Sequence, residues 1–410
     1  MLLANKLLDK NSNLTASSCS EETVLKSIDE RPEDVIKRTR AKLNSFPRDA
    51  LLWVDLSRAY AVLGQWKQAI RAMEIGLRLQ PTNRFVVRSA SRLFVHIDDP
   101  EYALRILRRS ETVKYDPWLL AAEISVGSIV GRSSRFIRTA YKLLDSLAKA
   151  PQHITELAGA LATVELYEGA VKNAKKLFDK SLQKPTDNTL AQAWWALRQV
   201  PKLDIKTDFL RIPFSFEARA LHDFQIENWK KVIKHCEDWL IDEPFSSRPA
   251  ELGSYVAAEA IEDYRLCEKL ARRGLEANPS HQMLLNNLVY ALANQKKLDD
   301  AEKIFRKIPR PADNTATECT LLATEGLLRF RRGNIEAGRL LYMNAMKLAK
   351  QDNLQVVRAA AAVHLAREEI IAHTSEVNKA VDSAQNECKL ITDSEITRLL
   401  HVVQKLNKKK

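Results

Sequence analysis

Prolines recur along this sequence at a nearly constant spacing. In the first half of the chain the spacings are 34, 36, 34 and 34 residues, along the series Pro47, Pro81, Pro117, Pro151 and Pro185. After a longer gap the series continues at 35 and 32 residues with Pro244, Pro279 and Pro311. Proline cannot continue an α-helix but is common in the turn after one. The spacing therefore predicts a repeated helical element that ends at each proline.

The segments between the prolines share a pattern of small and large apolar residues. Two examples are GQWKQAIRAMEIGLRLQP at 64–81 and ENWKKVIKHCEDWLIDEP at 227–244. A small residue is followed four positions later by a larger one, and three positions after that by another small one. Ala69, Met73 and Gly76 show the pattern, and so do Gly338, Tyr342 and Ala345. These spacings put all three residues on one helical face, which predicts close packing of helix on helix.

The first repeat resembles the tetratricopeptide repeat, a helix–turn–helix element of about 34 residues. The residues that carry the resemblance are Trp53, Leu56, Tyr60, Ala69 and Pro81, and it extends over about residues 31 to 390. It implies an all-α fold, a right-handed superhelical solenoid of about eight or more helical hairpins with capping helices. We expect the hairpins at 50–83, 84–119, 120–152, 154–187, 213–247, 248–281, 282–315 and 319–351.

The spacing breaks once, because Pro185 and Pro244 lie 59 residues apart. We expect an N-terminal tail, partly disordered, at 1–30 and a basic N-terminal array at 31–187. An irregular insertion or joint is expected at 188–212, a second array at 213–352, and C-terminal helices with a capping helix and a basic tail at 353–410. The apolar residues of the insertion either pack between the two arrays and fill the space there, or belong to a binding face.

No motif in the sequence indicates catalysis. The eight histidines are scattered without metal-binding spacing, the five cysteines form no CxxC pair, and no glycine-rich phosphate loop occurs. We therefore expect a protein that is not an enzyme and has no cofactor and no metal site. The N-terminus lacks the apolar core of a signal peptide and no apolar run is long enough for a membrane span. A cytoplasmic protein without membrane insertion is expected.

The resemblance implies that the first helix of each hairpin lines a concave groove. The candidate partner-binding residues on these helices are Arg58, Arg88, Arg92, Asn286, Tyr290, Asn294, Phe330 and Arg331. Arg88 and Arg92 share one helical face, and together with Arg58 they would bind a carboxylate, an acidic peptide or a phosphate. The polar ladder of Asn286, Tyr290 and Asn294 resembles the amides that hold an extended peptide in members of the family.

These features favour a non-catalytic scaffold or adaptor that binds an acidic or extended segment of a partner protein in its groove, within a larger complex. The charge balance of 64 basic against 52 acidic residues, or +12, supports an alternative, a helical-repeat protein associated with nucleic acid or ribonucleoprotein. Aromatic residues for base stacking are not interleaved with the arginines, which argues against that alternative. A second alternative is a regulatory subunit whose groove senses a ligand or peptide and controls a partner enzyme.

Overall fold

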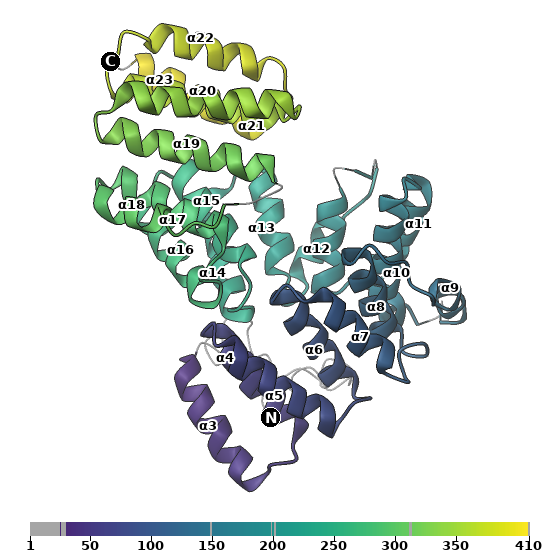
Figure 1. Ribbon diagram of the computed structural model, residues 1–410. Coiled ribbons are helices and arrows are strands. Elements are labelled where there is room, and N and C mark those ends of the chain that lie inside the picture. Colours follow the sequence, from purple (N-terminus) through teal and green to yellow (C-terminus); the bar gives the residue numbers. More distant parts are fainter. Residues whose placement is uncertain are drawn as a thin grey trace. The chain divides into compact units, whose positions relative to one another are not determined.

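The chain folds into helical hairpins, as the resemblance to the tetratricopeptide repeat implies (Figure 1). The computed structural model describes residue 25 and residues 30–147, 150–197, 199–200, 202–310 and 314–408, and no strand occurs among them. The predicted all-α repeat fold is confirmed. The tail expected at 1–30 lies outside the described residues except for Leu25 and Glu30. Two compact divisions, unit 1 (Met1–Pro249) and unit 2 (Ala250–Lys410), make up the chain.

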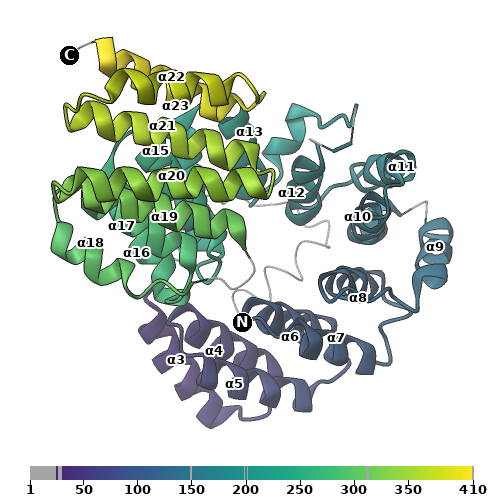
Figure 2. The ribbon, with the colours of Figure 1, turned by 45° about the horizontal axis from the view of Figure 1, so that its top comes forward.

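Unit 1 begins with α3 (Pro32–Ser45) and continues with helical hairpins. They are α4 (Ala50–Val62) with α5 (Trp66–Leu79), α6 (Arg84–His96) with α7 (Pro100–Arg109), α8 (Pro117–Ile129) with α9 (Ile137–Ser146), and α10 (Pro151–Tyr167) with α11 (Val171–Ser181). After α12 (Asp187–Ala196) and the short 3₁₀ helix η2 (Thr207–Arg211) comes the hairpin of α13 (Phe216–Gln225) and α14 (Trp229–Asp242). Figure 2 shows α8, α10 and α12 in succession, with α9 and α11 outside them.

Local capping explains where several of these helices begin. The carboxylates of Asp49 and Asp116 accept hydrogen bonds from the free N–H groups at the starts of α4 and α8. Pro117 and Pro151 occupy the first positions of α8 and α10, where the missing N–H is not needed. Some prolines of the series therefore open a first helix instead of following a second one, which is why the third hairpin begins at residue 117 and not at 120.

The segment 188–212, expected to be irregular, is helical in its first part. Thr186 and Thr189 form a reciprocal capping box that starts α12, and the buried side chain of Leu190 packs this helix into the core of the unit. Irregular structure begins only at residue 197. Phe209 and Ile212, which follow α12, pack against the same core. The division between the compact units falls later, between Pro249 and Ala250.

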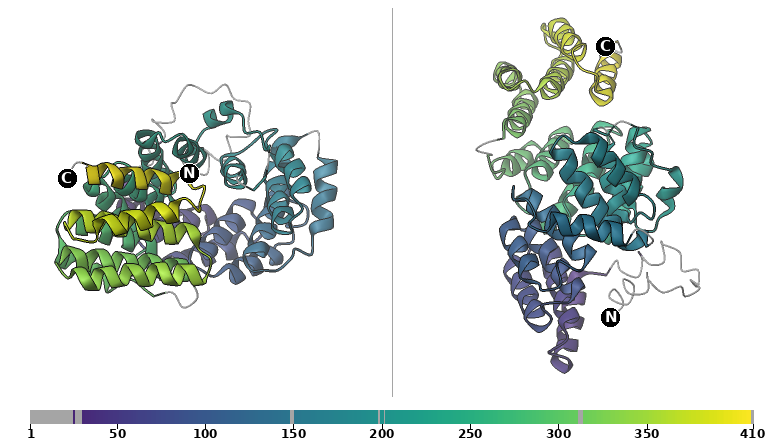
Figure 3. Two further views of the ribbon diagram at one scale, coloured as in Figure 1. Left: turned by 90° about the horizontal axis from the view of Figure 1, so that it is seen from above. Right: turned by 90° about the vertical axis from the view of Figure 1, so that its right-hand side faces the viewer.

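Unit 2 consists of further hairpins and one closing helix. The hairpins are α15 (Arg248–Glu259, most of which lies in this unit) with α16 (Tyr264–Ala277), α17 (Gln282–Asn294) with α18 (Leu298–Phe305), α19 (Thr315–Arg331) with α20 (Ile335–Gln351), and α21 (Gln355–Ile371) with α22 (Val377–Cys388). The last helix, α23 (Ser394–Lys408), packs against α21 and α22 and covers the end of the array (Figure 3). No helix in the described ranges combines the length and the apolar composition that a membrane crossing requires.

Candidate functional site

The arginines predicted to bind an acidic partner contact carboxyl-bearing residues of their own unit. A terminal nitrogen of Arg58 donates to the main-chain carbonyl of Asp242 at 2.6 Å, and Arg92 forms an ion pair with Glu243. Arg88, one turn before Arg92 on α6, pairs with a different carboxylate, Glu156 of α10, at 2.6 Å. The structure thus brings two of the three guanidiniums together at the end of α14, where the chain itself supplies the acidic segment.

The acidic residues Asp242 and Glu243 at the end of α14 interact electrostatically with the two arginines. Burial raises the pKa of Glu243, but Arg92 and the indole N–H of Trp239, which donates to the carboxylate at 3.0 Å, offset this and lower it below its ordinary value. Burial lowers the pKa of Arg58, and the coulombic effect of Asp242 opposes that shift. An acidic partner segment would have to displace this internal contact before it reached Arg58 or Arg92.

Replacing Glu243 with glutamine is expected to lower the free energy of unfolding by about 1 kcal/mol near neutral pH, because the half-exposed Arg92 loses its partner. The folded-state pKa of Glu243 is depressed, so its contribution is present above the unfolded pKa and is lost as the pH falls through the folded value. Urea unfolding of both proteins between about pH 7 and pH 3.5 measures this. The difference between them should vanish at the acidic end, and a pH-independent difference would contradict the assignment.

The five candidate residues of unit 2 fall into two groups. Asn286 and Tyr290 line a cavity of about 130 Å³. Phe330 is only 5% exposed and packs against Tyr342, with ring centroids 6.1 Å apart. Arg331 donates to Asn294 at 3.1 Å and pairs with the buried Glu368 at 3.0 Å. Phe330, Asn294 and Arg331 are therefore engaged in contacts within the unit.

Unit 1 carries a row of exposed large apolar residues that the sequence analysis did not single out. This apolar edge consists of Ile129, Tyr167, Trp195 and Ile226, which are 38–69% exposed. Each lies at or next to the C-terminal end of the first helix of its repeat, on α8, α10, α12 and α13. The rings of Tyr167 and Trp195 are 6.0 Å apart, and Ile129 and Tyr167 line one cavity. Ile129, Tyr167 and Trp195, from three successive repeats, are thus neighbours on one surface.

The cavity beside the apolar edge has a volume of about 470 Å³. Its lining comes mostly from α8, α9, α10 and the turn between α8 and α9. Figure 2 shows α9 outside α8 and α10. The apolar walls of the cavity include Ile124 and Val164. On the polar side, the hydroxyl of Tyr141 donates to Glu165 at 2.6 Å. A cavity with apolar walls and a few placed polar groups is suited to a large side chain or a small ligand.

The charge at this cavity is acidic although the whole chain is basic. Glu165 and Glu168 belong to its lining, and the lining arginine, Arg132, forms an ion pair with Glu101 at 2.9 Å. Burial and the hydrogen bond to Glu165 raise the pKa of Tyr141 most, and the negative charges of Glu165 and Glu168 raise it further. The field here favours a neutral or basic group over an acidic one.

A local signal in the sequence marks the apolar edge. Gly131, Gly169 and Glu227 adopt positive φ values of 69°, 79° and 57° in the turns between the helices of their hairpins. A large apolar residue stands one or two positions before each of these turns, at Ile129, Tyr167 and Ile226. A large apolar residue directly before such a turn lies at the end of its helix, where its side chain can remain exposed to solvent.

Within the described ranges, no three histidine, cysteine, aspartate or glutamate side chains are grouped as metal ligands. The four cysteines described there, Cys236, Cys267, Cys319 and Cys388, are buried and free. Burial raises the pKa of the Cys236 thiol above its ordinary value, so it is not a thiolate near neutral pH. The described ranges therefore show neither a metal-ligand cluster nor a reactive thiolate among these cysteines.

Comparison with known proteins finds only remote similarity, to solved structures. No protein-family model and no curated protein matches the sequence. Among solved structures, yeast Tom70 is 13% identical with a TM-score of 0.37, over 95% of this chain and 97% of that one. A human IFIT1 dimer with PPP-AAAA is 13% identical with a TM-score of 0.43, over 89% and 95%. The tetratricopeptide-repeat domain of P58(IPK) is 13% identical with a TM-score of 0.25, over 88% and 99%.

Proposed function

We propose that this protein is a non-catalytic interaction scaffold that binds a segment of a partner protein along the apolar edge of unit 1, as a subunit of a larger complex. The observation that carries the proposal is the exposure of Ile129, Tyr167, Trp195 and Ile226 on four successive first helices. Isolated apolar residues on a surface need no explanation, but a row that joins a cavity indicates an interaction site. Covering it removes apolar surface from water, which drives association.

The cavity between α8, α9 and α10 gives the partner segment an anchoring point. A volume of about 470 Å³ admits a large apolar side chain, and Ile129 and Tyr167 stand at its wall. Buried aromatic and aliphatic anchors of this kind dominate the energy of protein interfaces. The acidic groups Glu165 and Glu168 favour a segment that is neutral or basic next to its anchor. This departs from the acidic partner expected from the arginines.

The pairing of the arginines also weakens the nucleic-acid alternative at these sites. Arg88 and Arg92 already face carboxylates, and Arg58 is bonded to the carbonyl of Asp242. A phosphate backbone would gain little from charges that are neutralised within the protein. The alternative retains the support of the +12 net charge and is separated from the proposal by experiment.

The proposal is tested by affinity capture from the native lysate with a double variant, Ile129→Ser and Tyr167→Ser. Both side chains are largely exposed, so the variant should fold as the wild type does, which circular dichroism checks. At least one protein partner should be retained at least about tenfold less than by the wild type, since the anchor and its neighbour are removed. Quantitative mass spectrometry of the retained proteins gives the ratio.

The matched control replaces another exposed apolar pair, Leu340→Ser and Met343→Ser on α20 of unit 2. This control should retain the partners as the wild type does. Equal retention by all three proteins would show that the apolar edge is not the binding surface. Partners that are lost on nuclease treatment, with affinity for generic RNA that falls steeply with salt, would favour the nucleic-acid alternative instead.

A further inference from the structure

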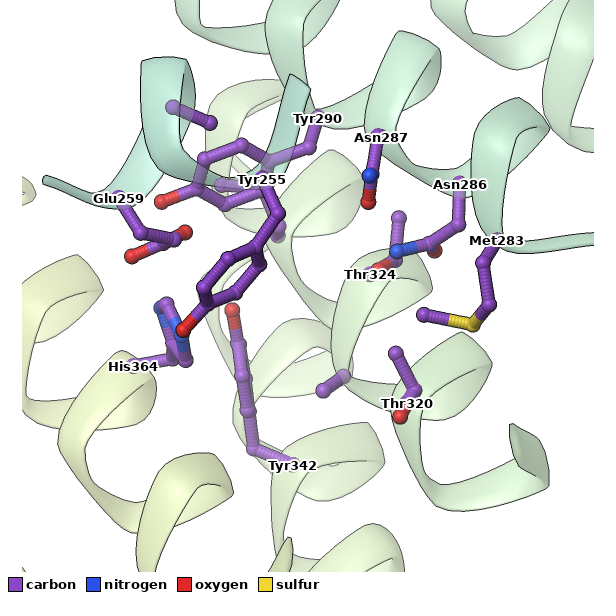
Figure 4. A pocket seen from close by; sticks show the side chains of 13 residues that line it. Tyr255, Glu259, Met283, Asn286, Asn287, Tyr290, Thr320, Thr324, Tyr342 and His364 are labelled. Carbon is purple, nitrogen blue, oxygen red and sulfur yellow. The ribbon is translucent and has the colours of Figure 1, made fainter. Parts of the chain in front are cut away.

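A second cavity lies within unit 2 and is lined by five of its helices. It has a volume of about 130 Å³, is partly open to solvent, and takes its lining from α15, α17, α19, α20 and α21 (Figure 4). The volume is close to that of an apolar cavity that holds one benzene molecule, so it fits a single side chain or a small organic group. The cavity is distinct from the apolar edge, which belongs to unit 1, and its function does not depend on that edge.

Aromatic rings and one carboxylate dominate the walls of this cavity. Tyr255 and Glu259 come from α15, Tyr290 from α17, Tyr342 from α20 and His364 from α21. Figure 4 shows these five side chains gathered at one end of the cavity. Glu259 is the one charged residue among the lining residues, since no lysine or arginine belongs to them. Burial lowers the pKa of His364, so its imidazole stays neutral near pH 7.

Two hydrogen-bond acceptors at the cavity have no partner in the described part of the chain. They are the Oε2 atom of Glu259 and the Oδ1 atom of Asn286. Asn286 is only 6% exposed, so its amide oxygen is withheld from bulk water. A buried polar atom without a partner costs about 1–3 kcal/mol, and native structures contain few of them. The carboxylate oxygen of Glu259 would be satisfied by a ligand that donates a hydrogen bond and carries a positive charge.

We propose that this cavity binds one alkylammonium group, held at one end by the carboxylate of Glu259 and the rings of Tyr255, Tyr290 and Tyr342, with its alkyl chain directed toward the end where Asn286 lies. An ammonium donates up to three hydrogen bonds, and the free carboxylate oxygen of Glu259 accepts one of them. Tyrosine rings attract a cation through their negative faces, and the attraction grows when water is excluded. A guanidinium fits less well, because its planar fork prefers two parallel acceptors on one carboxylate.

Two arginines beside the cavity are engaged by other groups, and one of them, Arg398, donates to the main-chain carbonyl of Glu259 at 3.0 Å. Arg367 lies outside the lining and donates to the hydroxyls of Tyr264 at 2.6 Å and Tyr290 at 2.5 Å. Its guanidinium is 3.6 Å from the carboxylate of Glu262. Because it holds the Tyr290 hydroxyl from outside, Arg367 fixes the orientation of one wall of the cavity.

The direct test uses n-butylammonium as the probe and n-butanol as its neutral counterpart of similar shape. Titration into the full-length protein is followed by the NMR signals of the Asn286 side-chain amide. Butylammonium should give a saturable shift with an affinity at least about tenfold higher than that of butanol, because only the cation pairs with the carboxylate and the rings. Equal binding of both probes, or no saturable shift with either, would overturn the proposal.

Variants assign the binding to the named residues. Glu259→Gln should weaken butylammonium binding at least about tenfold and leave butanol unaffected. Tyr255→Leu, which keeps apolar bulk but removes a ring, should weaken it by about fivefold, and it provides the result if the first variant fails to fold. Glu276→Gln is the matched control, since this glutamate of α16 is exposed and lies outside the lining. Loss of binding in the control equal to that in Glu259→Gln would contradict the assignment.

The same titration distinguishes the two natural sources of an alkylammonium. One arm uses a capped Ala-Lys-Ala peptide, which represents a lysine of a partner protein, and the other uses spermidine, which represents a free polyamine. Tighter binding of the peptide identifies a protein partner, and tighter binding of spermidine identifies a small metabolite. Failure of both to compete with butylammonium would show that the cavity is closed to natural ammonium groups and would overturn its assignment as a binding site.

Discussion

Replacing Arg331 with methionine is expected to lower the free energy of unfolding by about 3 kcal/mol near pH 7. The guanidinium of Arg331 holds the Glu368 carboxylate at 3.0 Å and the side chain of Asn294 at 3.1 Å. Glu368 is buried, and without Arg331 its charge would have no counterion at this distance. Methionine keeps most of the length of the arginine stem, so the loss reports the ion pair and not the packing.

The pH dependence of this variant provides an independent check. Burial already raises the pKa of Glu368 above its ordinary value, and Arg331 opposes that rise. Without the arginine the folded-state pKa rises further, so the folded state binds a proton before the unfolded state does. The penalty of Arg331→Met should therefore shrink as the pH is lowered from about 7 to about 5. Urea unfolding followed by circular dichroism measures it at each pH.

Arg329→Met is the matched control for Arg331→Met. Arg329 lies on the same helix and pairs with Glu325 at 3.2 Å, but it is largely exposed, so its removal should cost less than about 0.5 kcal/mol. A cost for Arg331→Met as small as that of the control would show that Arg331 is not needed for the fold. Arg331 would then again be a good candidate for contact with a partner, as its place on a first helix predicts.

The helical hairpins were predictable from the sequence because the information for them is local. The small and large residues of a helical face stand three and four positions apart, and the turns and caps lie within a few residues of the helices they bound. Ala69, Met73 and Gly76 are all buried on one face of α5, as the pattern indicates. The start of α12 is local in the same way, because Thr186 caps it and Thr189 takes the role that a glutamate or glutamine has in the usual capping box.

Whether a predicted site residue is already paired within the chain depends on contacts between residues far apart in the sequence, which a local sequence pattern does not predict. Arg92 meets Glu243, 151 residues later, and Arg58 meets Asp242, 184 residues later. Whether two such groups meet is set by the summed rotation of the intervening hairpins, each of which adds a small turn. The sequence could therefore place the arginines on first helices but could not show that the chain itself supplies their partners.

Replacing Gly338 with alanine is expected to lower the free energy of unfolding by about 2 kcal/mol, although alanine is the better helix former by about 1 kcal/mol. Gly338 lies where α20 crosses α19. A β-carbon built at this position would stand 2.6 Å from the ring of Phe330 and 2.9 Å from the backbone oxygen of Gly326. Phe330 is buried and the oxygen belongs to the backbone, so neither can move aside without separating the two helices.

The same substitution at Gly76 is the matched control, because this glycine also lies on the packed face of a second helix. A β-carbon there would meet its nearest atom, the backbone oxygen of Ala50, at 3.3 Å, which a shift of a few tenths of an ångström relieves. Gly76→Ala should therefore change the free energy of unfolding by less than about 0.5 kcal/mol, since the gain in helix propensity offsets the contact. Urea unfolding gives both values, and amide hydrogen exchange should show faster opening of α19 and α20 in Gly338→Ala alone. Similar effects of the two substitutions would mean that the two helices of a hairpin tolerate a wider separation. The small residues of the repeat would then not be required for close helix packing.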